Sequence, residues 1–158
     1  MKFHRMTMTA MAGLLALAAP LSTLGGTEID ETLEMPADGL VQVENLAGSV
    51  EFATWDRSEA QIRGEAGKDV EEVEISATSN GIQIRVRNPK NKRRVDGTDL
   101  YLRVPEQASI EAEGVSTDIT VSGGSGESIL LATVSGDLEV EASPGRIELQ
   151  TVSGDIEL

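Results

Sequence analysis

The strongest constraint on the fold is a sequence repeat in the last part of the chain. The segment TVSGDLEV, from Thr133 to Val140, returns as TVSGDIEL from Thr151 to Leu158. Two related segments come earlier, GVSTDITV from Gly114 and NLAGSVEF from Asn45. The last three copies are spaced roughly 18–19 residues apart, and such a repeat dictates the architecture, because each copy is one structural unit that stacks on the next.

Each copy divides into two halves of nine residues. Gly136, Gly145 and Gly154 are nine positions apart, and each precedes a polar residue and an apolar-x-apolar triplet. Because side chains alternate between the faces of a strand, a straight strand with this odd period would turn its apolar side chains outward. We therefore predict a corner every nine residues, made easier by glycine. Pro144-Gly145 suits a type II turn, which favours arcs between sheets over tight hairpins.

These corners predict an all-β fold in which region 106–158 is a β-solenoid with coils of about 18–19 residues. Coils of this kind stack about 4.8 Å apart. The apolar residues of one coil then lie over those of the next: Leu138 over Ile156 and Val140 over Leu158, with Ile147 and Leu149 on the facing sheet. An antiparallel β-sandwich is the alternative.

The preceding region, 27–105, is expected to be a less regular set of strands and hairpins within the same single domain, 27–158. Apolar residues occupy every second position in four segments, which is typical of strands with one buried face: Leu40–Leu46, Val73–Ala77, Ile82–Arg87 and Leu100–Val104. Asn80-Gly81 separates the second from the third, and this dipeptide predicts a hairpin because both turn positions favour positive φ.

The first residues have the layout of a secretory signal peptide. A basic start, MKFHR, precedes an apolar stretch and then small residues, so we predict a signal helix in region 1–26 with a cut between positions 18 and 26. The apolar run is well short of the ~20 residues that a spanning helix needs. No cysteine follows for a lipid anchor. We expect export to the periplasm or cell surface, with no integral membrane span after cleavage.

The charge balance excludes some partners. Without Lys2 and Arg5, 11 basic residues remain against 27 acidic ones, which leaves a net charge of −16. Nucleic acids and anionic lipid surfaces require a basic footprint, so we expect neither as a partner. The one basic run, NPKNKRR from Asn88 to Arg94, is interpreted as a solvated loop, with docking of an acidic glycan as the alternative.

Catalytic chemistry has few candidate residues. The chain has no cysteine, and its single histidine, His4, lies in the predicted signal peptide. This excludes Ser-His and Cys-His dyads and imidazole metal ligands from the mature chain. Asp137 and Asp155 would stack one coil apart, as would Glu139 and Glu157, and paired carboxylates can divide acid and base roles.

We interpret these carboxylates as structural. The glutamates fall at outward positions that keep a sheet soluble, and the aspartates are expected to cap their own turns with a local hydrogen bond. Trp55 is interpreted as packing at a strand end rather than as a platform for a sugar. We predict no catalytic residue, no cofactor and no metal ligand.

A glycine-rich segment, GGSGESILL from Gly123 to Leu131, nearly matches the calcium-binding nonapeptide of β-rolls. Ser128 stands where that motif needs an aspartate, and the motif occurs once, whereas such sites need consecutive copies. We interpret the segment as a turn.

The chain resembles a bacterial cell-envelope family of unknown function, the putative adhesins with β-strand repeats. The resemblance lies in VENLAGSVEFATWD, in LYLRVPEQASIEAEGVSTDITV and in the TVSGD segments, over roughly 40–158. It implies an exported all-β protein with a β-helix-like repeat region. The family has no generally accepted catalytic or ligand-binding residues that could be assigned to this chain. Members commonly continue for further repeats.

We therefore expect an exported, non-catalytic interaction or scaffolding module that binds a protein or glycan of the cell envelope. The alternative is a carboxylate-based β-helix enzyme acting on an envelope polysaccharide. Leu158 falls in the middle of a coil without a polar cap. We expect that the chain is truncated there; otherwise a partner or a second copy would cover the open coil.

Overall fold

The computed structural model describes residues 21–158, and every regular element within them is a β-strand, which confirms the predicted all-β class. The predicted signal helix lies outside the described residues. No helix in the described part is long and apolar enough to cross a membrane. The strands in chain order are β1 (Leu21–Thr23), β2 (Glu28–Glu34), β3 (Leu40–Trp55), β4 (Glu59–Glu65), β5 (Glu72–Thr78), β6 (Gly81–Arg87), β7 (Thr98–Pro105), β8 (Ser109–Ser122), β9 (Ser128–Ser135), β10 (Leu138–Glu141), β11 (Arg146–Ser153) and β12 (Ile156–Glu157).

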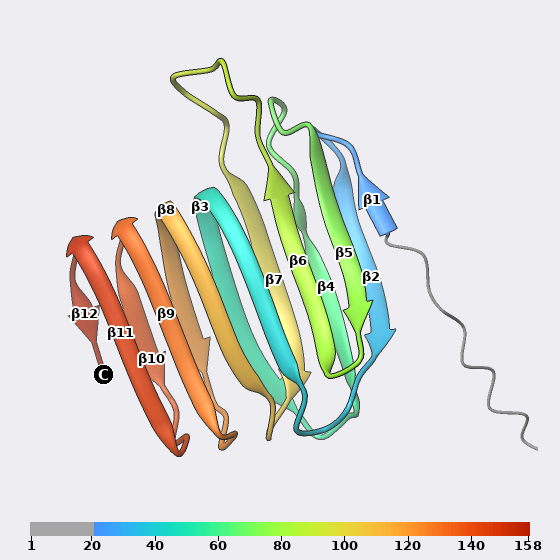
Figure 1. Cartoon of the computed structure of the whole chain (residues 1–158), viewed down its shortest axis with the longest axis vertical. Coiled ribbons are helices and arrows are strands. Elements are labelled where there is room, and N and C mark those ends of the chain that lie inside the picture. Colours follow the sequence, from blue (N-terminus) through green and yellow to red (C-terminus); the bar gives the residue numbers. More distant parts are fainter. Residues whose placement is uncertain (1–20) are drawn as a thin grey trace, which may run out of the picture.

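The strands form two layers that share β3 and β8, the two longest strands (Figure 1). The first halves of β3 and β8 pair in one layer, in the order β1-β5-β6-β3-β8-β9-β11. Their second halves pair in the other layer, in the order β2-β4-β7-β3-β8-β10-β12. Since both layers run through β3 and β8, the sheet is one flattened, nearly closed hydrogen-bonded network.

The direction of pairing changes along the layers. The pairs of β3 with β6, β7 and β8 are parallel, as are all pairs among β8 to β12. Antiparallel pairs are confined to the first part of the chain, where β1 pairs with β5, β5 with β6, β2 with β4, and β4 with β7. The repeat region is thus built from parallel pairs, whereas the less regular region is built largely from antiparallel ones.

The register follows the sequence repeat. Ile129 pairs with Ile147, one repeat later along the chain, and Leu138 pairs with Ile156 at the same interval. The predicted stacking of Leu138 on Ile156 is therefore confirmed. Ile147 lies on β11 in the other layer, as expected, because β11 pairs with β9 and not with β10 or β12.

The predicted hairpin joins β5 to β6, but its turn differs from the prediction. Thr78 pairs with Gly81, so the two turn residues are Ser79 and Asn80, and neither has a positive φ. Gly81, directly after the turn, has a φ of +158°, and it is also required for a steric reason. A Cβ there would lie 1.9 Å from the carbonyl oxygen of Leu40 on the neighbouring β3.

Three corners of the repeat region, at Gly136, Gly145 and Gly154, form without positive φ. Gly136, Gly145 and Gly154 are absent from the residues with positive φ, so the predicted type II turn at Pro144-Gly145 is wrong. Their role is steric, because a Cβ on Gly136 would lie 2.2 Å from the Thr117 carbonyl oxygen in the preceding copy of the repeat. Glycine at these corners lets successive copies of the repeat approach one another.

The corners explain how a repeat of nine residues, an odd number, can keep its apolar side chains in the core. Thr133 and Leu138 are five positions apart, yet both are buried, with 4% and 1% of their surface exposed. The four residues between them form a corner that reverses the inward-outward alternation. This is the corner predicted for every nine residues.

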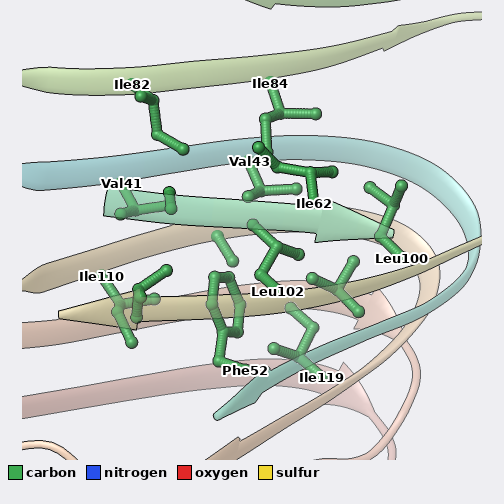
Figure 2. Close-up of a cluster of buried hydrophobic side chains, with 14 of the residues drawn as sticks. Val41, Val43, Phe52, Ile62, Ile82, Ile84, Leu100, Leu102, Ile110 and Ile119 are labelled. Atoms are coloured by element: carbon green, nitrogen blue, oxygen red, sulfur yellow. The ribbon is translucent and has the colours of Figure 1, made fainter. Parts of the chain in front are cut away.

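One apolar core fills the space between the layers. Figure 2 shows side chains from both layers meeting there, including Val41, Ile84, Phe52, Leu102 and Ile119. Phe52 is 1% exposed and is the largest fully buried side chain. The core continues into the repeat region through Ile129, Leu131, Leu138 and Val140.

Candidate functional site

The corner aspartates bind successive coils together. The Asp118 carboxylate accepts a hydrogen bond from the backbone N–H of Asp137, with 3.0 Å between Oδ1 and N. The Asp137 carboxylate accepts one in turn from the N–H of Asp155, at 2.8 Å. The donors lie 19 and 18 residues after the acceptors. The predicted local turn cap is therefore wrong, because each of these bonds joins one coil to the next.

The same corner position extends into the first part of the molecule. Ser49 on β3 pairs with Asp118 on one side and with Asp99 of β7 on the other. The Asp99 Oδ1 accepts hydrogen bonds from both the Ser49 N–H, at 3.1 Å, and the Ser49 hydroxyl, at 2.9 Å. A row of corner carboxylates thus runs along the molecule, with a serine in place of one of them.

The stacked glutamates lie in an open groove. Glu139 pairs directly with Glu157, as predicted, and both line a groove of about 660 Å³ together with Glu106 and Glu141. Gly123, Gly124, Ser125 and Leu158 are also among its lining residues. Two carboxylates on adjacent strands, about 5 Å apart, repel one another by about 1 kcal/mol in water. The groove is acidic and open, and no histidine or cysteine of the described residues lines it.

A row of exposed aliphatic side chains runs along the corner beside the aspartates. Leu46, Val115, Val134 and Val152 occupy the same position in successive copies of the repeat and are 39%, 44%, 47% and 78% exposed. Single exposed aliphatic residues are ordinary, whereas four at the same position of successive repeats place apolar surface along one corner.

Trp55 is held by its neighbours. Its indole N–H donates to the Glu59 carbonyl oxygen, with 2.8 Å between Nε1 and O. The Arg57 guanidinium lies 5.0 Å from the ring centroid and that of Arg103 5.9 Å from it. Both contacts are within the range of cation–π attraction. These contacts agree with the interpretation of Trp55 as a residue that packs at a strand end.

The glycine-rich segment forms the connection between β8 and β9. Gly123 and Gly124 have φ values of +85° and +115°, and the Ser125 N–H donates to the Glu106 carbonyl oxygen at 2.8 Å. Ser128 begins β9 and pairs with Arg146. Within residues 21–158 no three His, Cys, Asp or Glu side chains come together as a metal site.

The basic run forms a loop between β6 and β7 that projects beyond the ends of the strands (Figure 1). It borders an open groove of about 630 Å³, lined by Glu71 and by residues of β6 and the loop: Arg85, Arg87, Asn88, Pro89, Lys90 and Asn91. We call this the basic groove. It is lined by three cationic side chains, two amides and a single carboxylate.

Two of those cations are fixed in place by carboxylates on adjacent strands. Arg85 donates from Nε and Nη2 to the two carboxylate oxygens of Glu44, at 2.9 and 3.0 Å. These hydrogen bonds, and then the attraction between the two charges, raise the pKa of the Arg85 guanidinium. Arg87 donates from Nη2 to Glu74 at 2.9 Å. Both guanidinium groups remain accessible, with 40% and 52% of the side chain exposed.

The sequence did not reveal two of these features. The coil-to-coil bonds of Asp118 and Asp137 could have been suspected from the spacing of these aspartates, which equals the repeat. The basic groove forms because the loop lies beside the outward face of β6, where Arg85 and Arg87 are found. The alternation of apolar residues in β6 predicts that face but not the position of the loop.

Comparisons with known proteins give structures but no sequence match. No family model and no curated protein matches the chain. A putative cell adhesion protein from Clostridium sporogenes is 8% identical over 83% of this chain and 98% of its own, with a TM-score of 0.47. A putative adhesin from Bacteroides fragilis is 11% identical over 83% and 96%, with a TM-score of 0.32. A putative adhesin from Parabacteroides distasonis is 11% identical over 84% and 66%, with a TM-score of 0.40. These three structures carry the names of a putative cell adhesion protein and of putative adhesins.

Proposed function

We propose that the chain is an exported, non-catalytic cell-envelope protein that acts as an adhesin-like interaction or scaffolding module. One observation carries this proposal. Asp118 and Asp137 use a carboxylate oxygen to hold the next coil, while outward side chains form regular rows along the surface. Such an arrangement favours an extended binding surface over a reaction centre.

The repeat region is, on this proposal, a β-solenoid whose coils have the length of the sequence repeat. The parallel pairs of β8 with β9 and β10, and of these with β11 and β12, support it. So does the corner between Thr133 and Leu138, because both side chains point into one core. A solenoid presents the same side chain at the same place on each coil, which suits a module that contacts an elongated partner.

Export and location form a second part of the proposal. The signal peptide predicted for region 1–26 would deliver the protein to the periplasm or the cell surface. Intact mass and fractionation of the native protein test this directly. We expect the protein in envelope or periplasmic fractions, with a mass lower than that of the full chain by the weight of the signal peptide. Full-length protein in the cytoplasm would overturn the proposal.

The partner is proposed to be a protein or a glycan of the envelope. Purified mature protein should bind isolated envelope material, and the double variant Asp137→Ala/Asp155→Ala should bind as well as wild type if it remains folded. Loss of binding in that variant, with an unchanged melting temperature, would show that the corner carboxylates contact the partner themselves.

Self-association through β11 and β12 is a further part of this proposal for a chain in which no further strands follow residue 158. Within residues 21–158, β11 pairs only with β9 and β12 only with β10, so each has one open edge. Ile156 and Leu158 beside that edge are 45% and 76% exposed. Unpaired edges accept further strands. Sedimentation over a range of concentrations should detect an oligomer, and an Ile156→Lys variant should weaken it.

The acidic groove favours one alternative, a carboxylate enzyme acting on an envelope polysaccharide. Glu139 and Glu157 lie side by side in it. Release of new saccharide ends from envelope polysaccharide would reveal turnover. If Glu139→Gln or Glu157→Gln abolished such turnover without unfolding the protein, the non-catalytic proposal would be wrong.

A further inference from the structure

The positive charge of this acidic protein is concentrated in one short segment. Region 85–94 holds six of the 11 Lys and Arg residues that follow the predicted signal peptide, and it contains no Asp or Glu. The rest of the sequence after the predicted signal peptide holds only five basic residues and all 27 acidic ones. A cluster of this kind is the electrostatic footprint expected for an anionic ligand.

The structure arranges this segment as a binding groove. Arg85 and Arg87 extend from the exposed face of β6, and the loop adds Lys90, Asn88 and Asn91 around the same groove of about 630 Å³. Among residues 21–158, Lys90, Arg93 and Arg94 form no ion pair, so their charge is not neutralised by a neighbouring carboxylate.

The groove is also preorganised. Glu44 and Glu74 fix the Arg85 and Arg87 guanidinium groups from adjacent strands, and Lys92 forms an ion pair with Asp69 that ties the loop to the connection between β4 and β5. An arginine carries five N–H donors. Arg85 uses two of its N–H donors in these pairs and Arg87 uses one. Both side chains therefore keep donors for the carboxylate of a ligand.

The lining of the groove distinguishes among classes of ligand. Protein interfaces depend on buried aromatic or aliphatic anchors, and Pro89 is the only apolar residue among the described ones that line the groove. Single-stranded nucleic acid is bound largely by aromatic side chains that stack on its bases, and none of the described residues that line the groove is aromatic. A polysaccharide with carboxylate groups matches the cations through its acids and the two asparagine amides through its hydroxyl groups.

We propose that the basic groove binds an acidic polysaccharide, with Arg87 and Lys90 contacting its carboxylates. This inference rests on the proposed function and names the glycan class among its partners. Arg85 also lines the groove, and its hydrogen bonds to Glu44 hold this part of the lining in a fixed position. The acidic faces elsewhere on the molecule restrict a bound polyanion to this one place.

The test uses the exported, full mature chain and polygalacturonate as the probe, with its fully methyl-esterified form as the uncharged counterpart. Binding measured by calorimetry at low salt should be seen for polygalacturonate only and should weaken as salt is added. Equal binding to the esterified polymer, or no binding to polygalacturonate, would overturn the inference.

Matched variants locate the site. Arg87→Gln/Lys90→Gln removes the two cations proposed to contact the carboxylates, and affinity should fall about fivefold to tenfold. Arg63→Gln/Arg146→Gln removes the same charge elsewhere and should change affinity less than about twofold. Similar effects of the two variants would indicate only a general charge effect and overturn the site.

Two outcomes separate this inference from the proposed function. If the Arg87→Gln/Lys90→Gln variant binds envelope material normally and wild-type protein does not bind polygalacturonate, the groove is not the site and the interaction module stands. If a duplex oligonucleotide competes as strongly as polygalacturonate for wild-type protein, the groove is not selective for a polysaccharide and the inference is wrong.

Discussion

The Asp137 carboxylate accepts a hydrogen bond from the backbone N–H of Asp155, 18 residues further along the chain, at 2.8 Å. Asp118 bears the same relation to Asp137. A side chain that occupies one place in each coil therefore joins that coil to the next. Because a hydrogen bond to a charged acceptor is stronger than one between neutral groups, this row contributes to the stacking of the repeat region.

Asp137→Ala should therefore destabilise the repeat region. We expect a loss of about 1 kcal/mol in the free energy of unfolding, below the ~1.5–3 kcal/mol of a buried charged acceptor because the site is exposed. Urea unfolding measures the loss, and hydrogen exchange at the Asp155 amide should become faster. Asp137→Asn keeps an acceptor oxygen and serves as the control. Equal losses in the two variants would show that the bond contributes nothing.

Gly136→Ala should destabilise the protein through a steric clash and not through backbone conformation. The new Cβ would lie 2.2 Å from the Thr117 carbonyl oxygen, and this backbone atom cannot move aside cheaply. A cost of about 1–3 kcal/mol is expected. At Gly145 the nearest atom, the Glu127 carbonyl oxygen, is 2.9 Å away, so Gly145→Ala is the milder comparison. If Gly145→Ala proved the more damaging change when melting temperatures are compared, the steric account would fail.

Asn45→Asp should make the protein's stability depend on pH. Asn45 is 3% exposed, and its side-chain amide donates to the Thr98 carbonyl oxygen at 2.9 Å. A carboxyl group in this place can donate to that oxygen only when protonated, and burial raises its pKa above the unfolded value of about 3.9. The folded state then holds the proton more tightly. Relative to wild type, the variant should lose stability as the pH rises through the folded-state pKa and regain it below about pH 4.

Thermal unfolding of both proteins from pH 3 to pH 8 measures the difference between them. Asn45→Ala removes the hydrogen bond without adding a titrating group, so its loss of stability should be the same at each pH. A pH-independent difference for Asn45→Asp would contradict the assignment of a buried, carbonyl-facing side chain at this position.

The predicted signal cut should fall before Leu21. β1 pairs with β5 through Leu21 to Thr23, and the Gly26 N–H donates to the Ala66 carbonyl oxygen at 2.9 Å. A cut at the far end of the predicted range would remove these contacts and leave β5 as an edge strand. The sequence Ala16-Leu17-Ala18 has the small residues that signal peptidase prefers.

N-terminal sequencing of the exported protein should therefore begin at Ala19. A mature chain that begins at Thr27 would contradict this prediction. If such a chain were as stable to urea as one that begins at Ala19, β1 would also have no part in holding the fold.

Much of the architecture could be predicted from local patterns. Alternation of apolar residues places Val41, Ile84 and Leu102 in strands and in the core, because the two-residue period of a strand leaves no other assignment for them. The hairpin at Ser79-Asn80 was found from its dipeptide, although the turn lies one position earlier than that dipeptide implies.

The sequence by itself determined the repeat: a corner every nine residues and the stacking of Leu138 on Ile156 follow from an odd period in a structure that alternates in twos. Only the tertiary structure decided what the corner residues do. Asp137 bonds to the next coil, and Gly136 makes room for the Thr117 carbonyl, because parallel stacking brings backbone groups one repeat apart into contact. Only the tertiary structure joined Arg85 and Arg87 to Lys90 in one groove. Contacts between distant residues depend on how the layers pack, and a local pattern of residues carries no record of that packing.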